Sequence, residues 1–231
     1  MSEPRTVLSI QAHPDDTDFF AGGAVANLAE KGSRVVYVTV TDGSMGTLDP
    51  STKPKDLVRI REDEQKRAAE VLGVERVVFL RYPDSELYPS LRLRGKLIRT
   101  IREVKPDIVL TLDPWKPYEA HPDHRATGLM AYEAAAFAAL PHVNSRQLRS
   151  GLRTHLVREV HFFNTECPNV FVSISRTMKK KIRALRCHQS QGGSLMAEAA
   201  VKMNTSIGKR IGRAYAESFK VVKRSFPRLY E

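Results

Sequence analysis

The chain is poor in cysteine: Cys167 and Cys187 are the only two among 231 residues, and they form no Cys-x-x-Cys motif. Such a sequence offers neither a disulfide framework nor a thiolate metal site, and it is typical of a protein of the reducing cytoplasm. No apolar run approaches the ~20 residues that a membrane helix needs, so no membrane span is expected. The first residues lead directly into an expected strand without a charged segment and a following apolar stretch, which argues against a secretory signal.

Glycine is missing where a dinucleotide site would need it. The turn after the first expected strand reads His13-Pro14-Asp15-Asp16, and the pair Gly22-Gly23 falls inside the helix that follows. A turn that cradles phosphate needs its glycines between the strand and the helix. The sequence therefore predicts no dinucleotide cofactor, although its order of strands and helices resembles that of a Rossmann sheet.

Basic residues exceed acidic ones and give a net charge of +11, in a chain that is 42% hydrophobic and 27% charged. This composition supports a packed core. The basic residues are spread along the chain, with local density at Lys179-Lys180-Lys181 and near the C-terminus, which is typical of solvated helix faces. A nucleic-acid-binding module with salt-dependent binding is the alternative that this charge allows. No aromatic-rich basic motif supports it, so no specific nucleic-acid partner is expected.

Strand and helix patterns alternate along the chain. Apolar and β-branched runs predict strands at 6–11, 34–40, 76–80, 107–112, 159–164 and 170–174, and apolar residues at helical spacing predict helices at 17–31, 56–72, 90–104, 124–139, 176–188 and 196–216. This order predicts an α/β fold with a Rossmann-like, mostly parallel sheet, of order 3-2-1-4-5 plus an extra strand, and helices on both faces. We expect a single domain over 1–231 that ends in a C-terminal helical extension at about 196–231.

Two short motifs carry side chains that bind metals. Ala12-His13-Pro14-Asp15-Asp16 follows the first expected strand, and His121-Pro122-Asp123-His124 follows the fourth. In a sheet of the predicted order, strands one and four are neighbours at the switch point, and ligands bind beyond their carboxyl ends. The fold is therefore expected to bring together two segments that lie more than 100 residues apart in the sequence.

The residue types in these motifs predict a catalytic metal site. Two histidines and one carboxylate, with a position left for water, describe catalytic zinc, and we assign the ligands to His13, Asp16 and His124. Asp15 is then free to be the general base that activates a metal-bound water. His121 is free to act as a general acid or to stabilise the tetrahedral oxyanion.

Simpler interpretations exist for the same residues. Asp15 and Asp16 also fit the cap of a helix N-terminus, and His121 and His124 also fit surface positions beside a proline that starts a helix. The same ligands would serve an iron(II) oxygen enzyme, an alternative that leaves Asp15 and His121 without roles. The meeting of both motifs at the switch point favours the metal site, in which Asp123 is expected to hydrogen-bond a histidine ring and set its tautomer.

Together these motifs resemble those of the PIG-L/LmbE-like zinc-dependent de-N-acetylases, the N-acetylglucosaminyl deacetylase type. The resemblance covers nearly the whole chain, and the two metal motifs in this order are its specific part. The weaker matching segments are Thr41-Asp42-Gly43, Arg61-Glu62-Asp63-Glu64, Ala68-Ala69 with Leu72-Gly73, Pro83-Asp84, Lys105-Pro106-Asp107 and Cys187-His188-Gln189-Ser190-Gln191.

The resemblance implies a hydrolase that removes an N-acetyl group from an amino-sugar-containing substrate, cutting the carbon–nitrogen bond of a linear amide. It implies the same three ligands, Asp15 as base, a protonated His121, and zinc as the metal, with iron(II) or another divalent ion as the alternative. It further implies that Arg61 and Asp84 contact hydroxyls of the sugar, where the residues alone indicate a solvated helix charge and a turn. Homo-oligomers, trimers or hexamers, are typical of the family. The sequence does not identify the N-acyl substrate, nor does it assign roles to Asp42, Trp115, Tyr118 and His188.

Overall fold

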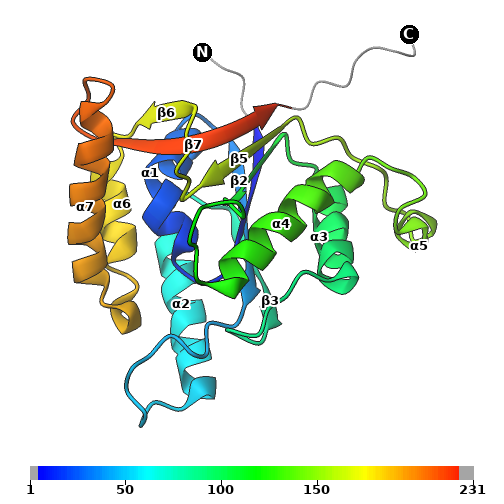
Figure 1. Cartoon of the computed structure of the whole chain (residues 1–231), viewed down its shortest axis with the longest axis horizontal. Helices are drawn as coiled ribbons and strands as arrows, with labels where there is room; N and C mark the ends of the chain where they lie inside the picture. Colours follow the sequence, from blue (N-terminus) through cyan, green and yellow to red (C-terminus); the bar gives the residue numbers. More distant parts are fainter. Residues whose placement is uncertain (1–4, 224–231) are drawn as a thin grey trace.

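The structure, a computed structural model, describes residues 5–223 and consists of one seven-stranded sheet between layers of helices (Figure 1). The strands are β1 (Thr6–Gln11), β2 (Arg34–Thr41), β3 (Arg76–Tyr82), β4 (Ile108–Leu112), β5 (Glu159–Phe163), β6 (Val170–Ser173) and β7 (Ala216–Lys223). The helices are α1 (Asp16–Glu30), α2 (Pro54–Leu72), α3 (Leu91–Val104), α4 (Pro122–Phe137), α5 (Ser145–Arg149), α6 (Met178–Leu185) and α7 (Gly193–Lys209), with a 3-10 turn at Gln189–Gln191.

The strands lie in the order β3-β2-β1-β4-β5-β7-β6. The first five run parallel to one another, whereas β7 runs antiparallel to both β5 and β6. In β2 every residue after Arg34 is buried, and its β-branched side chains suit a strand that is covered on both faces. The predicted α/β class, the mostly parallel sheet and the strand order 3-2-1-4-5 are confirmed.

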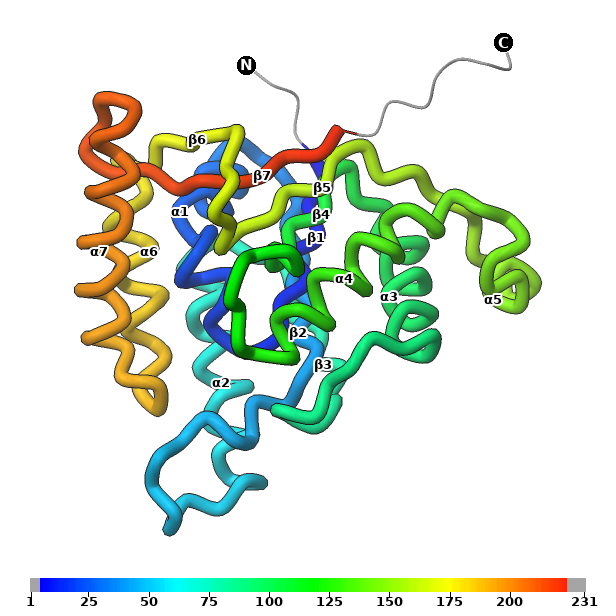
Figure 2. Tube along the Cα trace, viewed as in Figure 1, coloured from blue at the N-terminus to red at the C-terminus, as the bar shows by residue number. Residues whose placement is uncertain are grey.

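Helices cover both faces of the sheet (Figure 2). α1, α2, α6 and α7 lie on one side, and α3 and α4 lie on the other. Adjacent residues of β2 belong to different cores: Tyr37 packs in the cluster that contains Leu72 of α2, and Val36 packs in the cluster that contains Leu97 of α3. Among residues 5–223, no helix has both the length and the apolar character that crossing a membrane requires.

The predicted C-terminal helical extension at about 196–231 is wrong beyond α7. That helix ends at Lys209, and Ala216–Lys223 form β7, which lies between β5 and β6. The remainder of the prediction, residues 224–231, lies outside the described residues.

The side chains of β7 explain this difference. Phe219 and Val221 pack in the core beneath α1, and Glu217 accepts a hydrogen bond from a backbone N–H of α1, so these three residues share one face. Val222 packs in the opposite core. A period of two residues is typical of a strand, and packing on both sides of the sheet outweighs the helical spacing that precedes it.

Candidate metal centre and catalytic site

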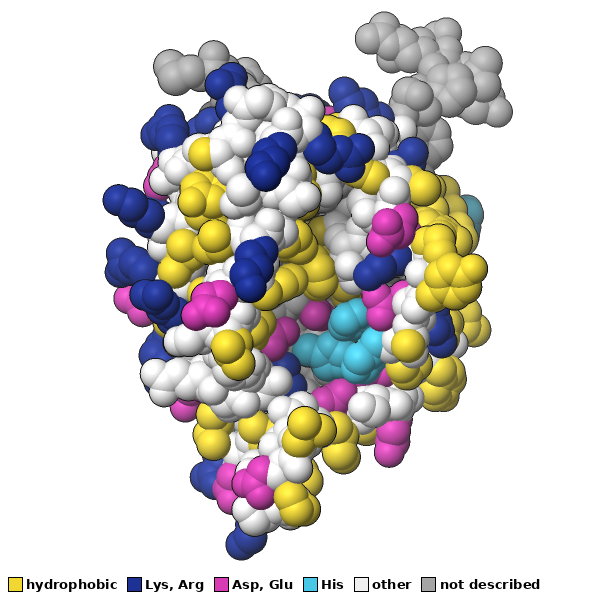
Figure 3. All heavy atoms as spheres, turned by 60° about the vertical axis from the view of Figure 1, so that its left-hand side comes forward, with side chains coloured by type: hydrophobic (Ala, Val, Ile, Leu, Met, Phe, Trp, Pro, Cys, Tyr) yellow, Lys and Arg dark blue, Asp and Glu magenta, His cyan; other side chains and the backbone are white. Residues whose placement is uncertain are grey.

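The two metal motifs meet at the carboxyl ends of neighbouring strands, as the strand order predicts. β1 and β4 pair in parallel. The turn after β1 carries His13, Asp15 and Asp16, and α4, which follows β4, begins directly after His121. Figure 3 shows histidine side chains gathered in a hollow of the surface, with acidic side chains around them.

His13, Asp16 and His124 form a compact group of possible ligands. Each offers one ligand atom, and these atoms lie within 4.8 Å of one another. Asp16 Oδ2 lies 3.7 Å from His13 Nδ1, and Asp16 Oδ1 lies 3.3 Å from His124 Nε2. Ligands at about 2.0–2.2 Å from a tetrahedral zinc ion stand about 3.3–3.6 Å apart, so the observed spacing fits such an ion.

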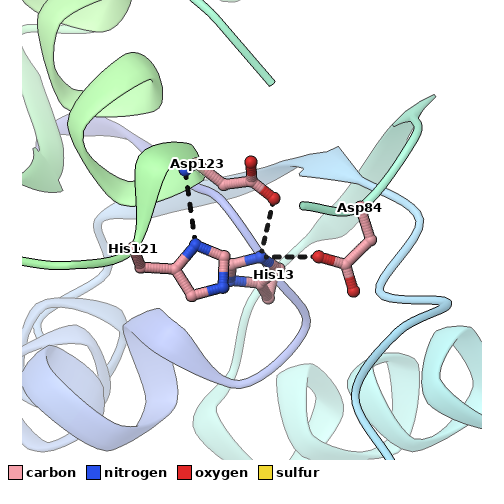
Figure 4. Close-up of side chains that lie close together, drawn as sticks. All are labelled: His13, Asp84, His121 and Asp123. Carbon is pink, nitrogen blue, oxygen red and sulfur yellow. Dashed lines mark hydrogen bonds and ion pairs between the residues drawn. The ribbon is translucent and has the colours of Figure 1, made fainter. Parts of the chain in front are cut away.

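Contacts behind this group determine which atoms face it. Asp16 Oδ2 accepts hydrogen bonds from the backbone N–H groups of Ala12 and His13, at 3.0 and 2.9 Å. The other ring nitrogen of His13, Nε2, lies 3.1 Å from Asp123 Oδ2 and 3.2 Å from Asp84 Oδ1 (Figure 4). A proton on Nε2 satisfies these carboxylates and leaves the lone pair of Nδ1 free for a cation.

A second compact group shares His13 and adds Asp84, His121 and Asp123. Asp123 is fully buried, and its carboxylate accepts hydrogen bonds from two backbone N–H groups of the loop after β3, at 2.8 and 3.0 Å. Asp84 accepts one from another backbone N–H at 3.0 Å. Backbone N–H groups already donate hydrogen bonds to the carboxylates of Asp84 and Asp123. These carboxylates therefore suit the role of orienting the His13 ring, whereas the group formed by His13, Asp16 and His124 suits the binding of the ion.

The site stabilises positive charge. Burial lowers the pKa of His13, but hydrogen bonds to three neighbouring carboxylates raise it well above its ordinary value. Burial also lowers the pKa of His124, but the Asp16 carboxylate outweighs this effect and raises that pKa above its ordinary value. Burial raises the pKa of Asp16, but the two histidines hold this pKa well below its usual range. Carboxylates that stabilise protonated histidine rings also stabilise a metal cation when the histidine rings are neutral. Both the donor set and the charge of the site therefore fit a divalent ion.

Asp15 lies beside this group in an unusual backbone conformation. Its φ of 106° falls in the left-handed region, which a non-glycine residue adopts only when its surroundings hold it there. Its N–H donates to Gln65 Oε1 at 2.9 Å, and its Oδ2 lies 3.2 Å from Arg61 Nη2. Burial raises the pKa of Asp15, against the opposing charge of Arg61. A carboxyl group with a raised pKa suits a general base.

His121 precedes α4 and caps it. Its Nδ1 accepts a hydrogen bond from the Asp123 N–H at 3.3 Å, which puts the proton of the neutral ring on Nε2. Its ring centroid lies 4.5 Å from that of His13 and 4.7 Å from that of His124. Burial lowers the pKa of His121, and the charges of these two neighbours lower it further. The ring therefore offers an N–H donor at Nε2 in either protonation state.

The two predicted sugar contacts lie against the site but are buried. Arg61 is 3% exposed, and besides contacting Asp15 it donates to the Gly43 carbonyl at 2.8 Å. A Cβ atom at Gly43 would lie 2.8 Å from Nη1 of Arg61 and would displace the guanidinium, and the φ of +66° at this position also favours glycine. Asp84 is 4% exposed and, as described above, faces a proposed ligand. In this structure Arg61 supports the proposed base and Asp84 supports that ligand.

The motifs in the sequence did not predict a buried network of polar side chains that lies behind the site. Gln65, which holds the Asp15 backbone, donates from Nε2 to Asp18 Oδ2 at 2.8 Å. The same oxygen lies 2.9 Å from Nε2 of His188, which is fully buried. One signal was available: Gln65 follows Arg61 by four residues and precedes Leu72 by seven, so both polar residues continue the buried stripe of α2.

The remaining side chains of unassigned role have plain surroundings. Asp42 Oδ1 accepts a hydrogen bond from the Ser44 N–H at 3.0 Å, which identifies Asp42 as a turn residue. Tyr118 is fully exposed. Trp115 is half exposed, and its ring contacts those of Tyr132 and Phe162.

Comparison with known proteins finds relatives along the chain. Residues 8–135 match the family model described as PIG-L, GlcNAc-PI de-N-acetylase. The diacetylchitobiose deacetylase of Thermococcus kodakarensis is 41% identical over 225 residues, which cover 96% of this chain and 84% of the relative. A probable N-acetyl-alpha-D-glucosaminyl L-malate deacetylase 2 of Bacillus anthracis is 28% identical over 212 residues, 86% of each chain.

Solved structures share the fold. The N,N'-diacetylchitobiose deacetylase of Pyrococcus horikoshii matches with a TM-score of 0.91 at 36% identity, over 98% of this chain and 88% of the other. The 4-carboxy-2-hydroxymuconate hydratase of Pseudomonas putida matches with a TM-score of 0.81 at 24% identity, over 98% of each chain. The second likeness concerns the fold alone, because one fold serves several chemistries.

Proposed function

The chain belongs to the PIG-L family of de-N-acetylases, and we propose that it hydrolyses the N-acetyl amide of a sugar that contains N-acetylglucosamine. The observation that supports this most directly is the group formed by His13, Asp16 and His124, with Asp15 beside it and outside the ligand set. Water adds across the carbon–nitrogen bond of a linear amide, and acetate and a free amino sugar leave.

His13, Asp16 and His124 would hold the divalent metal ion, which we propose is zinc. Asp84 and Asp123 would keep the His13 ring in the tautomer that leaves Nδ1 unprotonated. When bound, such an ion supplies a Lewis acid that polarises the acyl oxygen and makes water more acidic. Iron(II) accepts the same donor types, so elemental analysis of the purified protein decides between the two metals.

Asp15 acts as the general base in this proposal. Its carboxylate takes a proton from the attacking water, while Arg61 and Gln65 hold the residue in place. His121 donates a hydrogen bond from Nε2 to the oxygen on which negative charge develops. As the carbon–nitrogen bond breaks, Asp15 delivers the proton it took from water to the leaving amine, or His121 delivers one when its ring is the imidazolium.

The substrate we propose is an N-acetylated amino sugar of the diacetylchitobiose type, because the relative of that name aligns with 96% of this chain. The Asp84 carboxylate would accept a hydrogen bond from a sugar hydroxyl, and Arg61 would donate one. We further propose a cytoplasmic homo-oligomer, a trimer or hexamer as the family resemblance implies. The free thiols of Cys167 and Cys187 suit a reducing compartment.

Product analysis tests this function. Zinc-loaded protein is incubated with N-acetylglucosamine and with N,N'-diacetylchitobiose, and acetate and free amine are quantified together. We expect equal amounts of the two products and loss of both after chelation. Zinc-loaded protein that releases acetate from neither sugar would contradict the proposal.

A further inference from the structure

A pocket beside the catalytic site is lined by two exposed aromatic side chains. Its volume is about 400 Å³, which falls within the range of ~300–1,000 Å³ that is usual for ligand pockets. Tyr88 lines it from the loop after β3, Trp115 from the loop after β4, and Arg125 from α4. Tyr88 is 71% exposed and Trp115 is 58% exposed, so both rings are available to a ligand.

Two residues that line this pocket are directly bonded to residues of the catalytic site, although no proposed ligand or catalytic side chain lines it. Pro122 lines it and directly follows His121 in the sequence. Since successive helix positions point about 100° apart, the pocket lies on the face of α4 next to the one that bears the histidines. On its other side, Leu87 lines the pocket and donates its N–H to Asp123 Oδ1 at 3.0 Å. A substrate whose amide lies at the histidines can therefore extend into the pocket.

Trp115 is held as a fixed platform. Its ring meets Tyr132 edge-on at a centroid distance of 5.4 Å and Phe162 at 5.6 Å. These contacts orient the indole while more than half of its surface stays exposed. The C–H-bearing face of a pyranose ring packs well on an aromatic face, and a platform that is already ordered loses little entropy on binding.

We propose that Tyr88, Trp115 and Arg125 form a second sugar subsite, which binds the ring next to the N-acetylglucosamine unit that is deacetylated. The aromatic rings would pack on that second sugar, and Arg125, which already donates to the Glu119 carbonyl, has further N–H donors for its hydroxyls. The inference rests on the proposed function and sharpens it: the preferred substrate is a di- or oligosaccharide rather than a monosaccharide.

Trp115 is the single tryptophan of the chain, so its fluorescence reports occupancy of the subsite directly. The test titrates zinc-loaded Asp15→Asn protein, in which we expect hydrolysis to be about 10²–10⁴-fold slower, with diacetylchitobiose and with N-acetylglucosamine. We expect a saturable shift of the emission, with half-saturation at a roughly tenfold lower concentration of the disaccharide than of the monosaccharide. Emission that the disaccharide leaves unchanged, at concentrations that saturate turnover by the wild type, would overturn the subsite.

Tyr88→Ala provides a second variant, because Trp115 also packs on the core and its replacement can disturb folding. We expect kcat/KM for diacetylchitobiose to fall about five- to tenfold and that for N-acetylglucosamine to change less than about twofold. Tyr118→Ala is the matched control, since Tyr118 is a fully exposed aromatic residue that does not line the pocket.

The subsite would be overturned if Tyr88→Ala lost equal kcat/KM on both sugars. It would also be overturned if the loss accompanied a changed oligomeric state, measured by size-exclusion chromatography with light scattering. Either result would indicate that Tyr88 has a structural role. Failure of the proposed function has a separate signature. In that case zinc-loaded wild-type protein releases acetate from neither sugar, whatever the fluorescence titration shows.

Discussion

Arg61 Nη2 lies 3.2 Å from Oδ2 of Asp15, although α2 carries the first residue and the turn after β1 carries the second. The same guanidinium donates to the Gly43 carbonyl, and Gln65, one turn further along α2, accepts the N–H of Asp15. These contacts accompany the left-handed backbone of Asp15, with its φ of 106°. Helix α2 therefore holds the proposed base in place.

Removing the Arg61 charge tests this positioning role. In Arg61→Met we expect kcat on diacetylchitobiose to fall about 10²-fold, because a catalytic group displaced by about 1 Å loses that much. The zinc content should not change, since no ligand is touched. A raised KM with an unchanged kcat would indicate that Arg61 contributes only by binding the sugar and does not position Asp15. Arg59→Met, an exposed arginine of the same helix, is the matched control.

The base and a ligand should fail in different ways. Asp15→Asn removes the proton acceptor and leaves the ligand set intact, so we expect kcat to fall about 10²–10⁴-fold at full zinc occupancy. His13→Ala should lose both zinc and activity. Metal analysis and acetate release on the same preparations separate the two effects. Wild-type turnover by Asp15→Asn would remove the assignment of the base.

The two compact groups that share His13 make opposite predictions for zinc affinity. If His124 is a ligand, His124→Ala should abolish tight binding. Asp123→Asn should weaken it only about 10–100-fold, because Asp123 orients the His13 ring. Competition with a chromophoric zinc chelator measures both affinities. The reverse order of losses would assign the ion to the group that contains Asp123.

A buried ion pair links β7 to α6, and its removal should lower the stability of the fold. Lys181 Nζ lies 2.7 Å from Glu217 Oε1, and both side chains are fully buried. Glu217 also accepts the N–H groups of Gly23 and Ala24, at 2.9 and 2.7 Å. Lys181→Met leaves this carboxylate buried without its cation, so we expect the free energy of unfolding to drop by about 3–5 kcal/mol.

Urea unfolding of Lys181→Met and of a surface control measures this drop. Lys180 pairs with Glu30 and is partly exposed, so Lys180→Met should lower the free energy of unfolding by less than about 1 kcal/mol. Equal midpoints for the two variants would contradict the structural role of the buried pair.

The parts of the site that stand at strand ends could be predicted from the sequence. His13 follows β1 closely, and the loop after β4 leads to His121 and His124. The parallel pairing of β1 with β4 converts these positions in the chain into proximity in space. A ligand group built this way needs only the strand order, which the alternating pattern of strands and helices reveals.

The contacts of α2 could not be predicted in the same way. Residue spacing places Arg61 and Gln65 on the buried face, but their bonds to Asp15 depend on how the whole helix packs against the turn after β1. The strand β7 escaped for a related reason. Its alternation over Ala216–Lys223 is short and follows a long helical pattern, and it becomes decisive only when β5 and β6 lie on either side.

The most direct test of the proposed function measures acetate release from diacetylchitobiose as a function of the zinc bound per chain. Metal-free protein is reconstituted in steps, and bound zinc and acetate are quantified at each step. We expect a rate that rises in proportion to bound zinc, levels off at one ion per chain, and stays at least about 10²-fold lower in Asp15→Asn with the same zinc content. Full activity without zinc, or zinc-saturated wild-type protein that releases no acetate, would contradict the proposed function.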